Sequence, residues 1–268
     1  MNVRETYHSA PRRAVVYISG MQQSTGATPP RVMTIAGTDS GGGAGVAADL
    51  RTFAACGVHG CVAVTAVTVQ NSVGVTGVHT VPPEVAAAIA SMISVVASIP
   101  VLAASMHGDP LLAASALDAY RTLLFPRATV VTPNLDEVRL LAGVDVHDRA
   151  AQYAAAKALH ALGPRYVLVK GGHLREDTDA CVDLLFDGDT FTELPGPRFA
   201  TGNTHGGGDS MAAALASGLA RGLAVPAAVA FAKRYIVEAV RSAYPLGAGH
   251  GPVSSLWTGR PWWDEPPL

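Results

Sequence analysis

Four short clusters combine glycines with the polar residue types that phosphate chemistry uses. They are AGTDSGGGAG at 36–45, TPNLDE at 132–137, VKGGHL at 169–174 and NTHGGGDSMAAALASG at 203–218. In the fourth cluster, three glycines at 206–208 stand directly before Asp209, at the start of an expected helix. N–H groups at a helix start can hold a transferring phosphoryl group, and the carboxylate can accept the proton of the incoming hydroxyl. Three successive glycines exceed what a helix cap needs, so this cluster predicts phosphoryl transfer with Asp209 as the general base.

Each of the other three clusters allows a structural interpretation beside the functional one. The first lacks both the Walker lysine pattern and GxGxxG, so by itself it is a tight turn capped by Asp39 or Ser40. The spacing of Asn134 and Glu137 fits two ligands of a polyoxygen anion or its hydrated magnesium, and fits an N-cap with its capping-box partner equally well. Lys170 either neutralises phosphate charge or is an exposed lysine of an ordinary turn.

Strands and helices are predicted to alternate from Arg31 onward. The expected strands lie at 31–37, 61–70, 128–134 and 166–172, with a hairpin over 183–195 around its Asp-Gly turn. The expected helices lie at 46–56, 84–97, 110–124, 135–143, 150–163, 206–222 and 225–240. This alternation indicates an α/β fold with a mainly parallel sheet flanked by helices on both faces. Every cluster follows a strand, which is where such sheets bind ligands.

Composition excludes several other classes of protein. Of 268 residues, 49% are hydrophobic and 15% are charged, so the chain can bury a large core and its bulk is not disordered. The net charge of −2 gives no attraction to nucleic acid or to an anionic membrane. The most apolar stretch, 86–105, is interrupted by serines and a proline, so we expect a buried helix and a strand rather than a membrane span.

Cysteine usage and the ends of the chain complete the outline. Cys56, Cys61 and Cys181 are too few for a disulfide framework, which favours a cytoplasmic protein. We expect a poorly ordered N-terminal extension over 1–30, a single domain over 31–254 and a Pro/Trp-rich tail over 255–268.

Taken in order, the clusters resemble the hydroxymethylpyrimidine/phosphomethylpyrimidine kinases of thiamine biosynthesis, which belong to the ribokinase-like superfamily. The matching segments are VMTIAGTDSGGGAGVAADLRTFAACGVHGCVAVTAVTVQNSVGV, MHGDPLL, VVTPNLDEVRLLAG, ALGPRYVLVKGGHL, LLFDG, THGGGDSMAAALASGLARG and GHGPV. They cover most of residues 31–254. The resemblance implies a ribokinase-like fold that uses ATP and Mg²⁺. The implied substrates are 4-amino-5-hydroxymethyl-2-methylpyrimidine and then its monophosphate.

The resemblance also implies a role for each matching residue. Asp39 and Gln70 would contact the aminopyrimidine, while Gly37 and the loop at 41–45, which includes Gly43, would close around it. The residues implied near the nucleotide phosphates and magnesium are Thr132, Asn134, Glu137 and Lys170, with Glu137 reaching the metal through water. The implied anion hole is His205, Gly206, Gly207 and Gly208. Asp209 would be the base, at a position where many members carry cysteine and the wider superfamily carries aspartate.

One departure from the family lies between the helix at 84–97 and MHGD at 106–109. Family members have a further βα unit there, with a Lys-Thr-Gly-Met segment and an Asp-Pro-Val segment, and neither can be placed in this chain. Pro100-Val101 is the candidate remnant of the second segment, with Ile99 where its aspartate would stand. About thirty residues are missing, enough for one crossover, either because the protein lacks the unit or because the chain is recorded incompletely.

Two alternative functions remain open from the sequence. Pyridoxal kinase is the neighbouring activity, because ribokinase-like folds host several substrates, although the opening block and Gln70 favour the thiamine branch. The missing unit supports a catalytically impaired paralogue that binds a pyrimidine without turnover, whereas the presence of all four clusters argues against it. We expect a small-molecule substrate and no nucleic acid or membrane partner. The resemblance allows a homodimer, since related enzymes are commonly dimers.

Overall fold

The structure is a computed structural model that describes residues 28–92, 97–100, 114–172, 174 and 180–258. The N-terminal extension up to residue 27, MHGD at 106–109 and the tail beyond residue 258 therefore lie outside the described residues. No helix within the described ranges has the length and apolar character needed to cross a membrane.

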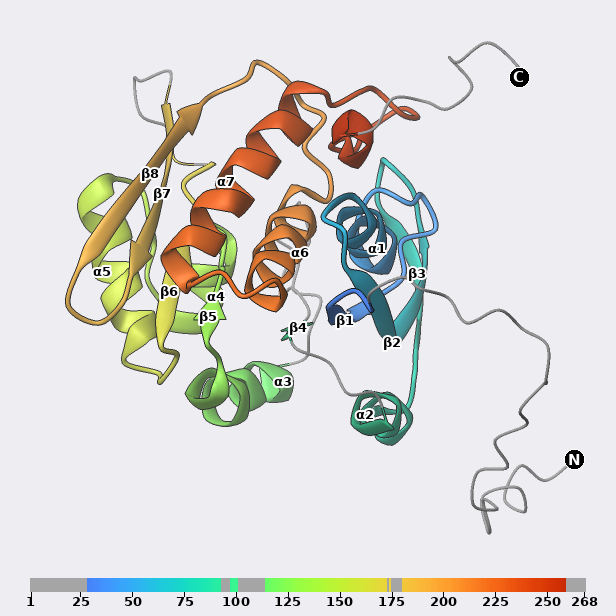
Figure 1. Ribbon diagram of the computed structural model, residues 1–268, viewed down its shortest axis with the longest axis horizontal. Coiled ribbons are helices and arrows are strands. Elements are labelled where there is room, and N and C mark those ends of the chain that lie inside the picture. Colours follow the sequence, from blue (N-terminus) through green and yellow to red (C-terminus); the bar gives the residue numbers. More distant parts are fainter. Residues whose placement is uncertain (1–27, 93–96, 101–113, 173, 175–179, 259–268) are drawn as a thin grey trace, which may run out of the picture.

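The strands of the described residues form two four-stranded sheets (Figure 1). The first has the order β3 (Val75–Thr80), β2 (His59–Gln70), β1 (Arg31–Gly37) and β4 (Ala97–Pro100). The second has the order β5 (Val130–Val131), β6 (Tyr166–Val169), β7 (Ala180–Phe186) and β8 (Phe191–Pro197). The pairs β1–β2, β1–β4 and β5–β6 are parallel, and the other three pairs are antiparallel.

Helices cover these sheets and join them. The α-helices of the described residues are α1 (Gly45–Ala55), α2 (Pro83–Met92), α3 (Ala114–Ala119), α4 (Leu135–Ala142), α5 (Arg149–His160), α6 (Gly207–Ala220) and α7 (Val225–Arg241). Helix α6 packs against α1, β1 and β4 of the first half and against α7, while α7 packs against β8 of the second half (Figure 1). The two sheets are therefore connected through the α6–α7 pair.

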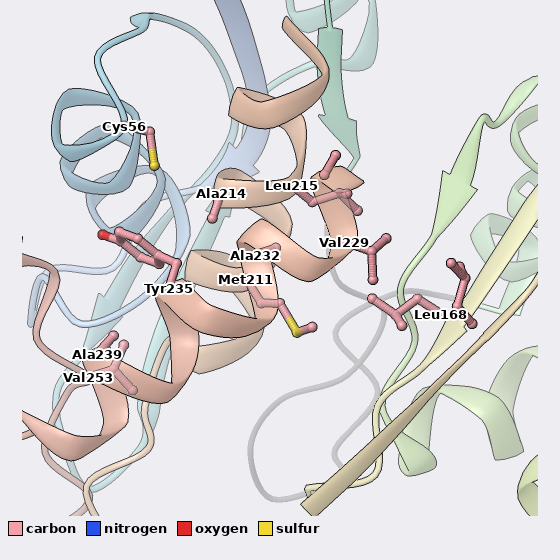
Figure 2. Close-up of a cluster of buried hydrophobic side chains, with 12 residues drawn as sticks. Cys56, Leu168, Met211, Ala214, Leu215, Val229, Ala232, Tyr235, Ala239 and Val253 are labelled. Carbon is pink, nitrogen blue, oxygen red and sulfur yellow. The ribbon is translucent and has the colours of Figure 1, made fainter. Parts of the chain in front are cut away.

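The second sheet has a core on each of its faces. Val167 and Val169 of β6 pack in a cluster with Leu159 of α5, whereas Leu168 packs with Met211 and other residues of α6 and α7 (Figure 2). Because successive side chains of a strand point to opposite faces, this division requires a helix layer on each side. The expected coverage of the sheet on both faces is confirmed here.

The structure differs from the expected single sheet in one respect. Strand β4 pairs with β1 over Ala97–Pro100, and no described strand joins β4 to β5. A continuous sheet would need a further strand at this place, which is where the sequence lacks one βα unit. Among the described residues the strands therefore form two sheets, and three of the six strand pairings are antiparallel, where a mainly parallel sheet was expected.

Strand β3 is an element that the sequence analysis did not predict. Five of its six residues are exposed, so it shows no alternation of apolar and polar residues. Its position is set by antiparallel pairing with β2 after the turn at 71–74. Strand β6 ends at Val169 rather than at the predicted residue 172, because Gly171 and Gly172 leave the sheet.

Candidate functional site

A cavity of about 1150 Å³ opens at the carboxyl ends of β1, β2, β5 and β6 and at the N-terminus of α6. This is the edge at which α/β sheets bind their ligands. Most of the predicted site residues line it: Gly37, Asp39, Gln70, Asn134, Lys170, His205, Gly206, Gly207, Gly208 and Asp209. The predicted residues Gly43, Thr132 and Glu137 are not part of its lining.

Asp39 organises the first glycine-rich loop. Its carboxylate accepts hydrogen bonds from the backbone N–H groups of Gly41, Gly43 and Ala44 at 2.8–2.9 Å. His205 Nε2 lies 2.8 Å from Asp39 Oδ2, and it must be the donor because an ionised carboxylate only accepts. Burial by itself would raise the pKa of Asp39, but these hydrogen bonds outweigh it and hold that pKa below its ordinary value. Asp39 therefore enters the site as a charged residue that shapes the loop.

The first and fourth clusters lie backbone against backbone. Gly206 has a φ of 71°, and a Cβ there would overlap the carbonyl oxygen of Gly43. Gly45 has a φ of 56°, and a Cβ there would overlap the carbonyl oxygen of Gly37. Both positions need glycine for its conformation and for its small size. The contact of Gly206 with Gly43 brings the start of α1 beside the start of α6, so two helix N-termini border the same cavity.

Asp209 lies in the first turn of α6, with part of its surface accessible. Burial has the largest effect and raises the pKa of Asp209 to about 6. The Lys170 charge and a hydrogen bond from the Gly45 N–H act in the opposite direction, whereas the Glu137 charge raises the pKa further. A carboxylate with this pKa is ionised at neutral pH and is a stronger proton acceptor than an ordinary aspartate.

The second cluster forms the capping box that its spacing allowed. Asn134 Oδ1 accepts from the Glu137 N–H at 2.8 Å, and Glu137 Oε2 accepts from the Asn134 N–H at 2.7 Å. The structural interpretation of this cluster is thus confirmed, while Asn134 also lines the cavity. Lys170 Nζ lies 3.8 Å from Glu137 Oε2, which joins the second and third clusters.

Glu137 has one oxygen that the capping box does not use. Its Oε1 atom is buried and has no hydrogen-bond partner among the described residues. A buried, unsatisfied carboxylate oxygen is costly unless a cation or water serves it. The part of the chain that the structure describes contains no group of three or more His, Cys, Asp and Glu residues arranged for a metal ion. Mg²⁺ needs only one or two carboxylates when phosphates and water supply the rest, so Glu137 fits a water-mediated magnesium site.

Gln70 faces the cavity with its amide weakly engaged. The hydroxyl of Thr68 donates to Thr38 O at 2.7 Å, so its 3.4 Å contact with Gln70 Oε1 is secondary. Gln70 Nε2 lies 3.5 Å from His205 Nε2, whose hydrogen is directed to Asp39. The Gln70 backbone is held firmly, because Ser40 Oγ accepts from its N–H at 2.8 Å and donates to its C=O at 2.6 Å. The Gln70 amide is thereby held at the cavity wall without a strong hydrogen bond of its own.

Several polar residues of this region were not predicted. Thr34 Oγ1 donates to Asp49 Oδ2 at 2.6 Å in the core behind the site. Burial and then the nearby Asp209 charge raise the pKa of Asp49 well above its ordinary value. Asp183 and Lys233 line the far part of the cavity. Of these residues, only Asp49 could have been noticed in the sequence, because it is an aspartate within a mostly apolar helical segment.

The chain is similar to known proteins over most of its length. A family model described as phosphomethylpyrimidine kinase matches residues 39–103 and 91–254. A hydroxymethylpyrimidine/phosphomethylpyrimidine kinase of Mycobacterium tuberculosis (strain H37Rv) is 53% identical over 264 residues, covering 87% of this chain and 96% of the relative. That alignment spans 264 residues but includes only 87% of this 268-residue chain, so about thirty residues of the relative have no counterpart here. The two matches to the family model overlap at residues 91–103. Both findings support the missing βα unit.

Solved structures resemble the fold closely. Pyridoxal kinase from Staphylococcus aureus in complex with AMP-PCP and pyridoxal has a TM-score of 0.78 and 30% identity, covering 86% of this chain and 94% of that one. Phosphomethylpyrimidine kinase from Clostridium difficile 630 has a TM-score of 0.68 and 28% identity, covering 79% of this chain and 99% of that one. The expected ribokinase-like fold is confirmed.

Proposed function

The chain belongs to the phosphomethylpyrimidine kinase family, and from that premise we propose that it is a hydroxymethylpyrimidine/phosphomethylpyrimidine kinase. It transfers the γ-phosphoryl group of ATP to the hydroxymethyl oxygen of 4-amino-5-hydroxymethyl-2-methylpyrimidine. It then transfers a second phosphoryl group to the monophosphate, which supplies the pyrimidine half of thiamine diphosphate. The observation that carries this proposal is Asp209, raised in pKa to about 6, at the glycine-rich start of α6 in the cavity wall.

Asp209 and the N-terminus of α6 perform the transfer. The carboxylate accepts the hydroxyl proton as the oxygen attacks the γ-phosphorus, and the bond from that phosphorus to the β-γ bridging oxygen breaks. The backbone from His205 to Gly208, at the start of α6, binds the phosphoryl oxygens while charge develops on them. Electrostatic stabilisation of this kind needs donors fixed in advance, and the close contact of Gly206 with Gly43 supports such rigidity.

The pyrimidine binds at the ends of β1 and β2. The Gln70 amide, held through its backbone but weakly engaged at its own atoms, pairs with the amino group and a ring nitrogen of the pyrimidine. Gly37 and the loop that contains Gly43 enclose the ring. Asp39 supports this loop by accepting its N–H groups and contacts the ligand from the same side.

The nucleotide phosphates lie toward Lys170 and Asn134, with Thr132 behind them. Lys170 neutralises phosphate charge, and Glu137 holds Mg²⁺ through water, which its unpartnered Oε1 supports. Bound magnesium would neutralise negative charge on the phosphates.

The use of ATP, the small-molecule substrate and three free cysteines fit a cytoplasmic enzyme, and nothing in the net charge favours a nucleic-acid or membrane partner. We propose a single kinase domain over 31–254 and leave a homodimer as an expectation of the family.

The proposal is tested by ADP release from the purified chain. We expect ATP turnover with the hydroxymethylpyrimidine and with its monophosphate, and slower turnover with pyridoxal as the comparison substrate. Faster turnover of pyridoxal would favour the second candidate, a pyridoxal kinase, which the similarity to the S. aureus enzyme supports. A folded protein that binds the pyrimidine without forming ADP would indicate the impaired paralogue, which the divided sheet supports.

The pKa of Asp209 predicts the acid limb of the pH profile. The base must be ionised, so kcat/KM for the pyrimidine should fall about tenfold per pH unit below pH 6 and level off above pH 7. Initial rates between pH 5 and 8 with saturating ATP would measure it. An acid limb near pH 4 would show that Asp209 is not perturbed in the working enzyme.

A further inference from the structure

A buried ion pair lies behind the loop that carries Lys170. Lys233 Nζ of α7 lies 2.8 Å from Asp183 Oδ2 of β7, and the two side chains are only 9% and 5% exposed. Lys233 also donates to the carbonyl oxygen of Cys181 at 3.0 Å. A buried carboxylate is costly without an opposite charge, and Lys233 supplies that charge.

The second oxygen of Asp183 holds the loop itself. Asp183 Oδ1 accepts a hydrogen bond from the Gly171 N–H at 2.8 Å. The ladder between β6 and β7 ends at the pair Val169–Leu184, so Gly171 is beyond the reach of regular strand pairing. A Cβ at Gly171 would overlap the carbonyl oxygen of Val182, so the backbone of the loop lies in close contact with β7. The aspartate side chain therefore continues the attachment where the backbone ladder stops.

Lys170 lies between this attachment and a second one. Its own N–H donates to Pro133 O at 3.0 Å, which ties it to the strand-to-helix turn that contains Asn134. Gly171, the next residue, is tied to Asp183. With the backbone fixed on both sides, the Lys170 side chain lines the cavity and its Nζ lies 3.8 Å from Glu137 Oε2.

We propose that Asp183, paired with Lys233, is a positioning residue for the nucleotide: it holds the loop so that Lys170 faces the phosphates of a nucleoside triphosphate. The inference rests on the proposed function, because it assumes that this part of the cavity takes ATP. It assigns to the pair an effect on nucleotide affinity that a purely structural ion pair in the core would not have. Asp183 acts through Gly171 and Lys170, without a contact of its own to the reacting atoms.

Two double variants separate the hydrogen bond from the ion pair. Asp183→Asn with Lys233→Met removes both charges but keeps an oxygen that can accept from Gly171. Asp183→Leu with Lys233→Met removes both charges and the acceptor, and replaces a buried ion pair by apolar groups of similar size, an exchange that proteins often tolerate. Should the leucine variant fail to fold, Asp183→Ala with Lys233→Met removes the same acceptor with less bulk.

We expect the leucine variant to raise the KM for ATP about tenfold while the KM for the pyrimidine stays within about twofold. The asparagine variant should keep the KM for ATP within about threefold of the parent. Leu159→Ala is the control for lowered stability, since Leu159 is fully buried in the core on the α5 face of the same sheet and is not part of the cavity lining. It should lower the unfolding temperature and leave both KM values unchanged.

Calorimetric titration with ADP gives a readout that does not depend on turnover. Weaker ADP binding in the leucine variant than in the asparagine variant supports the inference even if no pyrimidine is phosphorylated, in which case only the proposed function fails. Equal ADP affinity in the two variants overturns the inference. An equal loss of ADP and pyrimidine affinity in the leucine variant also overturns it, because the pair would then support only the fold.

Discussion

Asp209→Asn is expected to lower kcat by about 100-fold or more, with ADP affinity within about twofold of the parent. Removing a positioned proton acceptor costs about this much in enzymes that use one. The asparagine has nearly the same size and can still accept the Gly45 N–H, so the start of α6 should keep its shape. Nucleotide binding depends on Lys170 and the backbone of α6, which the change leaves in place.

The measurement is single-turnover phosphorylation of the hydroxymethylpyrimidine, with ADP affinity from calorimetry. Asp189→Asn in the exposed turn between β7 and β8 is the matched control, because it removes one carboxylate far from the cavity. The acid limb near pH 6 should disappear together with the activity. An unchanged kcat in Asp209→Asn would remove this residue from the mechanism.

Lys170→Ala is expected to lower kcat/KM for ATP by about 100-fold, while the KM for the pyrimidine changes by about twofold or less. A fixed positive charge on transferring phosphates typically contributes an effect of this size. The Lys170 charge also lowers the pKa of Asp209, so losing that charge should shift the acid limb of the pH profile to higher pH.

Glu137→Ala should likewise weaken the use of ATP or magnesium more than that of the pyrimidine, with some loss of stability from the broken capping box.

Varying ATP at saturating pyrimidine, and the pyrimidine at saturating ATP, would separate the two effects. Lys157→Ala on α5 serves as the control, since this lysine contacts the ring of Phe191 outside the cavity. If the pyrimidine KM rose and the ATP parameters did not, the nucleotide and pyrimidine ends of the cavity would have to be exchanged.

The division of the sheet bears on both predictions. Strand β4 and strand β5 are not joined by any described strand, yet the residues assigned to chemistry lie at the carboxyl ends of β1, β2 and β6 and at the starts of α4 and α6. The second sheet packs on α6 and α7 in one core (Figure 2), and Val32 of β1 packs with Ala213 and Ala216 of α6 in another. The site therefore does not depend on one continuous sheet, which is why we expect turnover despite the missing unit.

Features that depend on neighbouring residues could be predicted from the sequence alone. Ala-rich stretches predicted α1, α5, α6 and α7 to within a few residues, because helix propensity is a local property. The helix expected at 46–56 is followed by Gly57, which has the left-handed φ of 70° that favours glycine just after a helix. The capping box between Asn134 and Glu137 was one of two interpretations of their spacing, and it forms because both partners lie within one helical turn.

Features that join distant segments could be recognised only in the folded protein. The charge of Asp39 is stabilised by His205, 166 residues away. Burial and the Glu137 charge raise the pKa of Asp209, and the Lys170 charge opposes them. Strand β3 forms because β2 offers it a ladder, despite an exposed and irregular pattern. The pairing of Asp183 with Lys233 left no local signal at all. Electrostatics and strand pairing act through space, so they depend on how the chain is folded and not on the order of residues around each group.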